Sequence, residues 1–331
     1  MIRTASRGAL LAAALAFGSA AHAAQPAVVY DAGGKFDKSF NEAAYNGFER
    51  FKKDTGTAYL EFEVTNDTQR EQALRRMAQK GADPVVAIGF SQASALEKVA
   101  KEFPKTRFAI IDSEVKLPNV QSVLFKEEEG SFLAGWLAAT TSKSAKVGFI
   151  GGMDVPLIRR FACGYEQGAK HANPKVEVVS NMTGTTPAAW ADPTRGGELA
   201  KAQFSRGVDV VFAAAGATGM GVYQAAKDQG KLAIGVDSNQ NHLQPGTMLS
   251  SMLKRVDNAV YRILASAKDG TWKPGLTVLG LKDQGVGLAM DQYNAKLVSD
   301  DTRKKLAAVE ADLVNGKLKA TTYTPEAGCK Y

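Results

Sequence analysis

Residues 85–112, VVAIGFSQASALEKVAKEFPKTRFAIID, contain two short apolar runs separated by a helical stretch. The runs Val85–Gly89 and Arg107–Asp112 are apolar continuously rather than alternately, as in parallel strands that are covered on both faces. Between them, Ala93–Glu102 carries apolar residues at helical spacing. This strand–helix–strand unit predicts a parallel sheet between layers of helices.

The same unit repeats along most of the chain. The other predicted strands are Ala27–Asp31, Tyr59–Val64, Gln121–Phe125, Lys146–Gly151, Val176–Asn181, Asp209–Ala213, Leu232–Asp237 and Thr247–Met252. The other predicted helices are Phe40–Asp54, Gln69–Gln79, Gly130–Thr141, Leu157–Ala172, Thr194–Arg206, Thr218–Asp228 and Asp257–Lys268. We therefore expect an α/β protein with two doubly wound parallel-sheet lobes joined by a hinge. Residues 25–125 and 256–290 are expected to form the N-terminal lobe, and residues 126–255 and 291–331 the C-terminal lobe.

The first 24 residues are predicted to be a signal peptide. A short basic region with Arg3 and Arg7 precedes the apolar stretch Gly8–Ala20, and cleavage is expected after Ala23 or Ala24. The apolar stretch is shorter than the roughly 20 residues that a membrane-spanning helix needs. Because no cysteine lies near the cleavage site, we expect no lipid anchor and a protein in the periplasm.

Composition argues against several classes of function. The net charge is +7, of which the predicted signal peptide contributes two, and the basic residues of the remainder are scattered among acidic ones. Nucleic-acid-binding proteins concentrate basic residues on one face, so no nucleic-acid partner is expected. The three histidines, His22, His171 and His242, show neither metal-ligand spacing nor a catalytic arrangement. We therefore expect no enzyme, no metal and no cofactor.

Cys163 and Cys329 are the only cysteines of the chain. In an oxidising compartment an even number of cysteines permits a disulfide, which here would tie the C-terminal tail to the second lobe. Two unpaired thiols, one of them buried, are the alternative. The sequence leaves both open.

Polar or glycine residues follow six of the predicted strands. They are Asp31, Gly89, Asp112, Gly151, Gly216 and Asp237. In open α/β sheets, ligands bind outside the carboxyl ends of the strands. The pattern therefore predicts a ligand cleft between the two lobes, although a single aspartate in such a place is often only a helix cap.

The segment after the first strand, DAGGKFDKSFN at 31–41, joins a glycine turn to a helix. Gly33 and Gly34 permit a tight turn, and Ser39 is expected to cap the helix with Glu42 close behind. A dinucleotide-binding turn is the alternative, but the GxGxxG pattern is absent and a secreted protein rarely meets NAD.

The run DAGGKFDKSFNEAAYNGF at 31–48 resembles the first motif of the basic membrane protein family, the purine-nucleoside receptor type of type I periplasmic binding protein. The resemblance continues in AIGF at 87–90, AIIDSEV at 109–115, KVGFIGGM at 146–153, PLIRRFACGYEQGAK at 156–170, WADPTRGGELA at 190–200, FAAAGATGMGV at 212–222, IGVDSNQ at 234–240 and SMLKRVD at 251–257. It implies a type I periplasmic-binding-protein fold. It also implies a solute receptor that serves an ABC permease in the inner membrane.

The resemblance further implies an aromatic sandwich around a flat base. Phe40 is the expected first ring and Trp190 the second. A core position for Phe40 and an exposed loop position for Trp190 are the alternatives. Asp31 and Asn41 would bind the edge of the base.

Other residues are implied around the sugar and the walls. Asp237 and Lys254 would hold the sugar, unless they only form an ion pair across the hinge. Asp112 is the next carboxylate of the cleft, and Gly216 would offer its backbone N–H. Phe90 and Phe161 would be walls of the pocket or core residues.

Several alternatives stay open for the function. A free nucleobase, a sugar or another small polar solute could replace the purine nucleoside as ligand. An exported nucleoside hydrolase would need a tight cluster of aspartates or histidines, which the chain does not show. A receptor that presents its closed lobes to a membrane sensor has the same fold. We expect a monomer, because closure about a hinge needs no second subunit.

Overall fold

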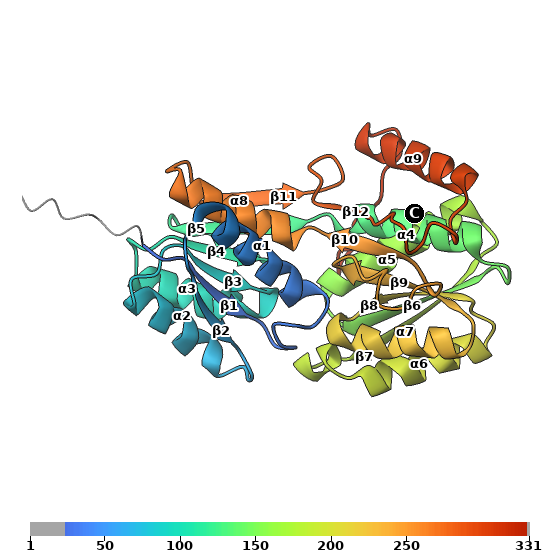
Figure 1. Ribbon diagram of the computed structural model, residues 1–331, viewed down its shortest axis with the longest axis horizontal. Coiled ribbons are helices and arrows are strands. Elements are labelled where there is room, and N and C mark those ends of the chain that lie inside the picture. The colour runs from blue at the N-terminus through green and yellow to red at the C-terminus, as the bar shows by residue number, and fades with distance from the viewer. Residues whose placement is uncertain (1–23, 330–331) are drawn as a thin grey trace, which may run out of the picture.

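The computed structural model describes residues 24–329, which form two α/β lobes lying side by side (Figure 1). The predicted signal peptide, residues 1–24, lies outside the described residues except for Ala24. Each lobe contains one six-stranded sheet with helices on both faces. This is the doubly wound arrangement that the sequence predicts.

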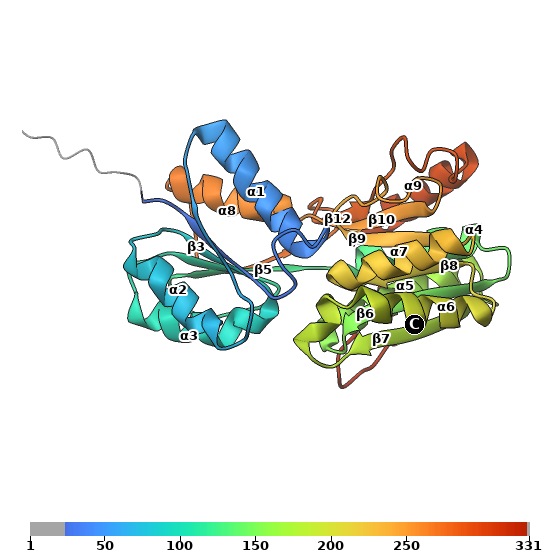
Figure 2. The same ribbon diagram turned by 60° about the horizontal axis from the view of Figure 1, so that its bottom comes forward.

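The sheet of the first lobe has the strand order β11-β5-β4-β3-β1-β2, and all of its pairs are parallel. Its strands are β1 (Ala27–Tyr30), β2 (Leu60–Glu63), β3 (Val85–Ile88), β4 (Phe108–Ile111), β5 (Val120–Phe125) and β11 (Gly275–Leu279). Its helices are α1 (Phe40–Thr55), α2 (Gln69–Gln79), α3 (Ala93–Glu102) and α8 (Val256–Lys268). Helices α1 and α8 cover one face of the sheet, and α2 and α3 cover the other (Figure 2).

The sheet of the second lobe has the order β12-β10-β9-β8-β6-β7, parallel except for β12 against β10. Its strands are β6 (Lys146–Met153), β7 (Glu177–Gly184), β8 (Val210–Ala214), β9 (Leu232–Asp237), β10 (Met248–Lys254) and β12 (Val286–Leu288). Its helices are α4 (Glu127–Thr141), α5 (Pro156–Ala172), α6 (Pro193–Ser205), α7 (Gly219–Asp228) and α9 (Asp300–Val314). Helices α4 and α5 pack on one face, and α6 and α7 on the other.

Strands β1, β3, β4 and β8 are apolar throughout because each of their faces meets a helix layer. In β3, Val86 and Ile88 belong to the core under α1 and α8, whereas Val85 and Ala87 belong to the core under α2 and α3. All four side chains are fully buried. A strand with two buried faces favours apolar side chains, so polar residues come only before or after these four strands.

Three short connections join the lobes and form the hinge. They run from β5 to α4, from β10 to α8 and from β11 to β12. The predicted N-terminal-lobe segment 256–290 therefore extends too far, since β12 pairs with β10 in the second sheet. Helix α9 was not predicted, and it packs against α4 in the second lobe.

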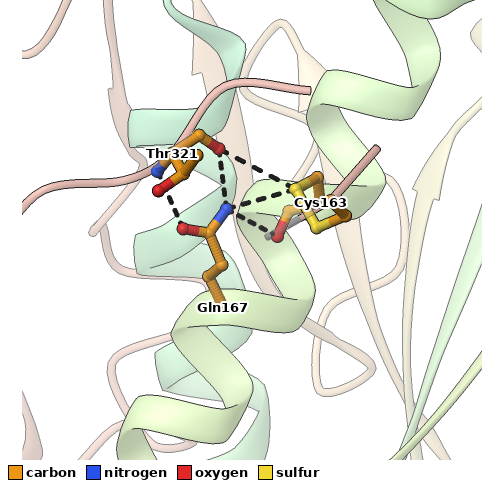
Figure 3. The surroundings of a disulfide bond; sticks show 4 residues. Cys163, Gln167 and Thr321 are labelled. Carbon is orange, nitrogen blue, oxygen red and sulfur yellow. Dashed lines mark hydrogen bonds between the residues drawn. A yellow bond between two sulfur atoms is a disulfide. The ribbon is translucent and has the colours of Figure 1, made fainter. Parts of the chain in front are cut away.

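The disulfide that the sequence left open joins Cys163 in α5 to Cys329 in the C-terminal tail, with a Cα–Cα distance of 5.5 Å. The tail is also held by Gln167, whose side chain donates to the carbonyl oxygen of Thr321 (2.8 Å) and accepts from its backbone N–H (2.8 Å) (Figure 3). Gln167 lies one helical turn after Cys163, so both contacts fix the tail on one face of α5. The tail therefore belongs to the second lobe.

Candidate functional site

A cavity lies between the lobes, with about 590 Å³ of empty space when the part open to solvent is counted. It is lined by all ten residues that the sequence singles out, namely Asp31, Phe40, Asn41, Phe90, Asp112, Phe161, Trp190, Gly216, Asp237 and Lys254. The carboxyl ends of strands from both sheets supply most of these residues, as expected for open α/β folds.

Two carboxylates of the cavity have an unusual backbone conformation. Asp112, directly after β4, has φ +72°, and Asp237, the last residue of β9, has φ +63°. Residues other than glycine rarely adopt positive φ, although aspartate and asparagine tolerate it better than most. Such conformations persist where the surrounding structure holds them and they cluster at functional sites.

A buried ammonium group lies at the floor of the cavity. The Nζ atom of Lys254 is 2.6 Å from Oδ2 of Asp112 and 3.1 Å from Oε1 of Glu127. The side chain of Lys254 is only 1% exposed. Phe40, Phe125 and Phe161 surround the ammonium group, with ring centroids 5.1–5.5 Å away. The ion pairs of Lys254 are thus with Asp112 and Glu127, rather than the pair with Asp237 that was the sequence-based alternative.

Burial and neighbouring charges shift the pKa values of this group in different directions. Burial alone would lower the pKa of Lys254, but the carboxylates of Asp112, Glu127 and Asp237 raise it above its ordinary value. Burial raises the pKa of Asp112 to about 6, although the ammonium of Lys254 acts against this. Lys254 therefore stays charged at neutral pH.

Asp237 is the third carboxylate close enough to Lys254 to interact with it electrostatically. Its Oδ2 atom accepts a short hydrogen bond from the hydroxyl of Ser39, a residue of the first lobe. Burial raises the pKa of Asp237 to about 6, against the lowering effects of Lys254 and of the Ser39 hydrogen bond. The hydrogen bond from Ser39 therefore favours the ionised form of Asp237.

The start of helix α1 differs from the prediction in one respect. The side chain of Ser39 does not cap the helix. Asp37 does so instead, since its carboxylate accepts from the backbone N–H groups of Ser39, Asn41 and Glu42. Asp37 also lines the cavity, and burial raises its pKa to about 6. A capping aspartate three residues before the helix leaves the Ser39 hydroxyl free for another contact.

The side chains of Asp31 and Asn41 both form hydrogen bonds with other residues of the first lobe. Asp31 accepts from Arg70 (3.1 Å) and from the hydroxyl of Ser91 (2.6 Å). Asn41 donates both of its amide hydrogens, to the carbonyl oxygens of Asp31 and Gly34 (3.1 Å each). Asn41 therefore braces the glycine turn and keeps only acceptor capacity for a ligand.

Two glycines make room for neighbouring side chains of the site. A Cβ atom at Gly89, which follows β3 with φ +106°, would overlap the carboxylate of Asp31. A Cβ atom at Gly152 in β6 would overlap the ring of Trp190. Trp190 ends the short 3₁₀ helix η2 (Pro187–Trp190), and its ring packs against the bare backbone of Gly152 in the second lobe.

The sequence did not single out Asp37, Arg70 or Glu127. Each acts through contacts between segments far apart in the chain, which local patterns do not reveal. For Glu127 the signal was present but unspecific, since three consecutive glutamates begin the otherwise apolar helix α4.

Within residues 24–329, no helix has the length and apolar character to cross a membrane. The same residues contain no group of three or more histidine, cysteine or acidic side chains arranged to hold a metal ion. The charges of the cavity are instead compensated by Lys254 and Arg70.

The two hinged lobes and the cavity between them define a solute-binding protein. In agreement, residues 24–322 match the sequence model of the family described as "ABC transporter substrate-binding protein PnrA-like". The chain belongs to this family. Its members are binding proteins rather than enzymes, act outside the cytoplasm and pass a small molecule to an ABC permease.

Individual relatives agree with this assignment. The chain is 33% identical to "ABC transporter nucleoside-binding protein BmpA" of Lactococcus lactis over 88% of its length and 87% of the relative. It is 33% identical to "Basic membrane protein D" of Borreliella burgdorferi, covering 86% of this chain and 84% of that one. The predicted resemblance to the basic membrane protein family is confirmed.

A solved structure confirms the predicted fold. The solute-binding protein of an ABC transporter system from Aeropyrum pernix superposes with a TM-score of 0.83 at 28% identity, covering 90% of this chain and 93% of the other. The type I periplasmic-binding-protein fold therefore applies to this chain.

Proposed function

We propose that this protein captures a purine nucleoside, or a related flat heterocycle, in the interlobe cavity and delivers it to an ABC permease. The observation that carries the proposal is a cavity with aromatic rings on its walls and carboxylates and a lysine on its floor. Phe40 comes from the first lobe and Trp190 from the second. A flat ring between them would be in contact with both lobes and would favour the closed form.

The polar groups of the cavity suit the edges of a nucleoside. Oδ1 of Asp112 is buried and has no hydrogen-bond partner among the described residues, so it can accept from a donor of the ligand. Asp237 and Lys254 can together bind the hydroxyls of a ribose, the carboxylate as acceptor and the ammonium as donor. The nucleoside-binding name of the Lactococcus relative supports the same ligand class.

A free nucleobase is the second candidate ligand, because Asp112 and Lys254 already satisfy each other in part without a sugar. A sugar ligand would leave the aromatic walls without a flat partner, and a nucleoside hydrolase would need a cluster of groups for water activation. The monomeric state, the absence of nucleic-acid binding, a periplasmic location and cleavage after Ala23 or Ala24 remain predictions.

A thermal-shift screen tests the ligand class. Ligand-stripped protein is heated with guanosine, adenosine, hypoxanthine, ribose or glucose, and the correct solute at ~100 Kd should add about 2.7 kcal/mol to the free energy of unfolding. We expect the largest shift with a purine nucleoside. A shift with hypoxanthine alone would retain the receptor and remove the sugar roles of Asp237 and Lys254. A shift with the sugars alone would contradict the proposal.

Phe40→Ala is expected to raise the dissociation constant of the nucleoside about 5- to 150-fold, which corresponds to 1–3 kcal/mol for one stacked base. Calorimetric titration measures this change. Phe36→Ala is the matched control, because Phe36 lies on the same segment but is 59% exposed and does not line the cavity. Equal affinities of the Phe40 variant and the wild type would contradict the aromatic sandwich.

Nucleoside affinity is expected to fall as the pH drops below about 6, the value to which the pKa of Asp112 and of Asp237 is raised. Hydroxyl donors bind the ionised carboxylates, so binding below this pH must release protons. Calorimetry at pH 5.5 in two buffers of different ionisation enthalpy should detect this release, and Asp237→Asn should reduce it. An affinity that is constant from pH 5 to 8 would refute the expectation.

The same pKa shifts act oppositely on the stability of the ligand-free protein. A carboxyl with a raised pKa binds more protons in the folded state than in the unfolded state. Its contribution to the free energy of unfolding therefore decreases as the pH rises from about 4 to about 6. Because the nucleoside affinity is expected to fall below about pH 6, the stabilisation by ligand should be larger at pH 7 than at pH 5.

A further inference from the structure

Ser39 is placed to connect the two lobes directly beside the cavity. It is fully buried in the loop that precedes α1 of the first lobe. Its hydroxyl donates to Oδ2 of Asp237, at the end of β9 in the second lobe. Because Asp37 already caps α1, this hydroxyl is not needed for the helix.

Further hydrogen bonds across the lobes surround this contact. The hydroxyl of Ser238 donates to the carbonyl oxygen of Ser39 (2.9 Å), and the side-chain amide of Gln240 donates to the carbonyl oxygen of Lys38 (2.9 Å). The loop before α1 is thus bonded to the segment that follows β9. These bonds join the two lobes, so a motion that separates the loop before α1 from the segment after β9 would break them.

The hydroxyl bond also determines how Asp237 faces the cavity. It engages Oδ2, whereas Oδ1 accepts no hydrogen bond from the described residues. A carboxylate held through one oxygen presents the other in a defined direction, which strengthens a charge-assisted bond to a ligand hydroxyl. Opening of the lobes removes this support.

We propose that Ser39 is a positioning residue that orients Asp237 toward the ligand in the closed receptor and so makes ligand release depend on lobe opening. The proposal rests on the function proposed above. It assigns to Ser39 a role in affinity and release rather than in helix capping. Ser39 acts through Asp237.

Titration of Asp237 provides a readout that a purely structural serine would not affect. The groups that influence the ionisation of Asp237 are Lys254 of β10, Asp37 of the loop before α1 and Glu127 of α4, in addition to the Ser39 bond. Tyr223 of α7 and Asp112 after β4 also interact electrostatically with it. Since the Ser39 bond lowers the pKa of Asp237, its removal should raise that pKa further.

Ser39→Ala is compared with the wild type by stopped-flow binding of guanosine. We expect a dissociation rate at least about tenfold higher with an association rate changed less than about threefold, because the bond exists only in the closed complex. The pH at which half of the guanosine affinity is lost should be higher for Ser39→Ala than for the wild type, because the pKa of Asp237 is then higher. Ser250→Ala is the matched control, because this buried serine makes one hydrogen bond inside the second lobe, to the carbonyl oxygen of Ala289.

The two proposals can fail separately. If the wild type binds guanosine but Ser39→Ala has an unchanged dissociation rate and pH profile, the role of Ser39 is overturned and the proposed function stands. If the wild type does not bind guanosine, the nucleoside proposal loses its support. The role of Ser39 is then decided by electron–electron distance measurements between spin labels on the two lobes of the ligand-free protein. A shift of Ser39→Ala toward longer distances supports the role, and an unchanged distribution overturns it.

Discussion

Lys254→Met is expected to lower the free energy of unfolding by about 3–5 kcal/mol, the usual cost of removing one partner from a buried ion pair. The substitution fills much of the same space but leaves the carboxylates of Asp112 and Glu127 buried without their common cation. Urea denaturation at pH 7.5 measures the change. The deficit should shrink as the pH is lowered toward 5, because burial raises the pKa of Asp112 to about 6 and this orphaned carboxyl is then mostly protonated.

Two further variants separate charge from packing in this experiment. Lys101→Met removes an exposed lysine that pairs with Glu97, and it should leave the free energy of unfolding nearly unchanged. Adding Asp112→Asn to Lys254→Met removes one of the unpaired charges and should recover part of the loss, since asparagine also tolerates positive φ. A double variant less stable than Lys254→Met alone would show that the ion pair is not the source of the effect.

Replacing both cysteines, Cys163→Ala with Cys329→Ala, is expected to lower the free energy of unfolding by about 2–5 kcal/mol. The disulfide joins residues separated by 166 positions, and closing so long a loop restricts the unfolded chain strongly. Denaturation under non-reducing conditions measures the loss. Guanosine affinity should change less than about twofold, since the part of α5 that lines the cavity (Leu157, Ile158 and Phe161) keeps its packing.

Gln167→Leu helps to interpret this result. It removes the hydrogen bonds that hold Thr321 but retains the disulfide, and it should cost clearly less than the double cysteine variant. If the cysteine variant unfolds at the same denaturant concentration as the wild type, the disulfide restrains only the tail and not the unfolded chain as a whole.

Most of the fold could be predicted because two-sided burial leaves a strong sequence signal. Val85–Ile88 is entirely apolar for this reason, and the predicted strand there is confirmed. The prediction missed elements with weak burial. Only the last residue of β11 is buried, and α9 buries only Leu306 and Leu313 among its fifteen residues. Their positions depend on contacts with distant segments rather than on a local apolar pattern.

The candidate site was predictable for residues that stand at the carboxyl end of a buried strand, because sheet geometry directs this end toward the cleft. Asp112 and Asp237 follow buried strands, so both face the cleft wherever the intervening helices lie. Ser39 shows the limit of such reasoning. The capping rule applied to its local sequence, but Asp37 satisfies the helix and the serine turns to a carboxylate almost two hundred residues away. Which of the two residues, Asp37 or Ser39, caps the helix depends on tertiary contacts, and a rule based on local sequence does not include these contacts.

The order of the strands constrains how the protein can be made. β11, which completes the first sheet beside β5, follows five of the six strands of the second lobe in the chain. The second lobe in turn receives β12, α9 and the tail that carries Cys329 only afterwards. Neither lobe is a contiguous piece of chain, so a nascent polypeptide cannot finish one before starting the other. Both become complete only near the end of synthesis, and no single cut can release either lobe as an intact fragment.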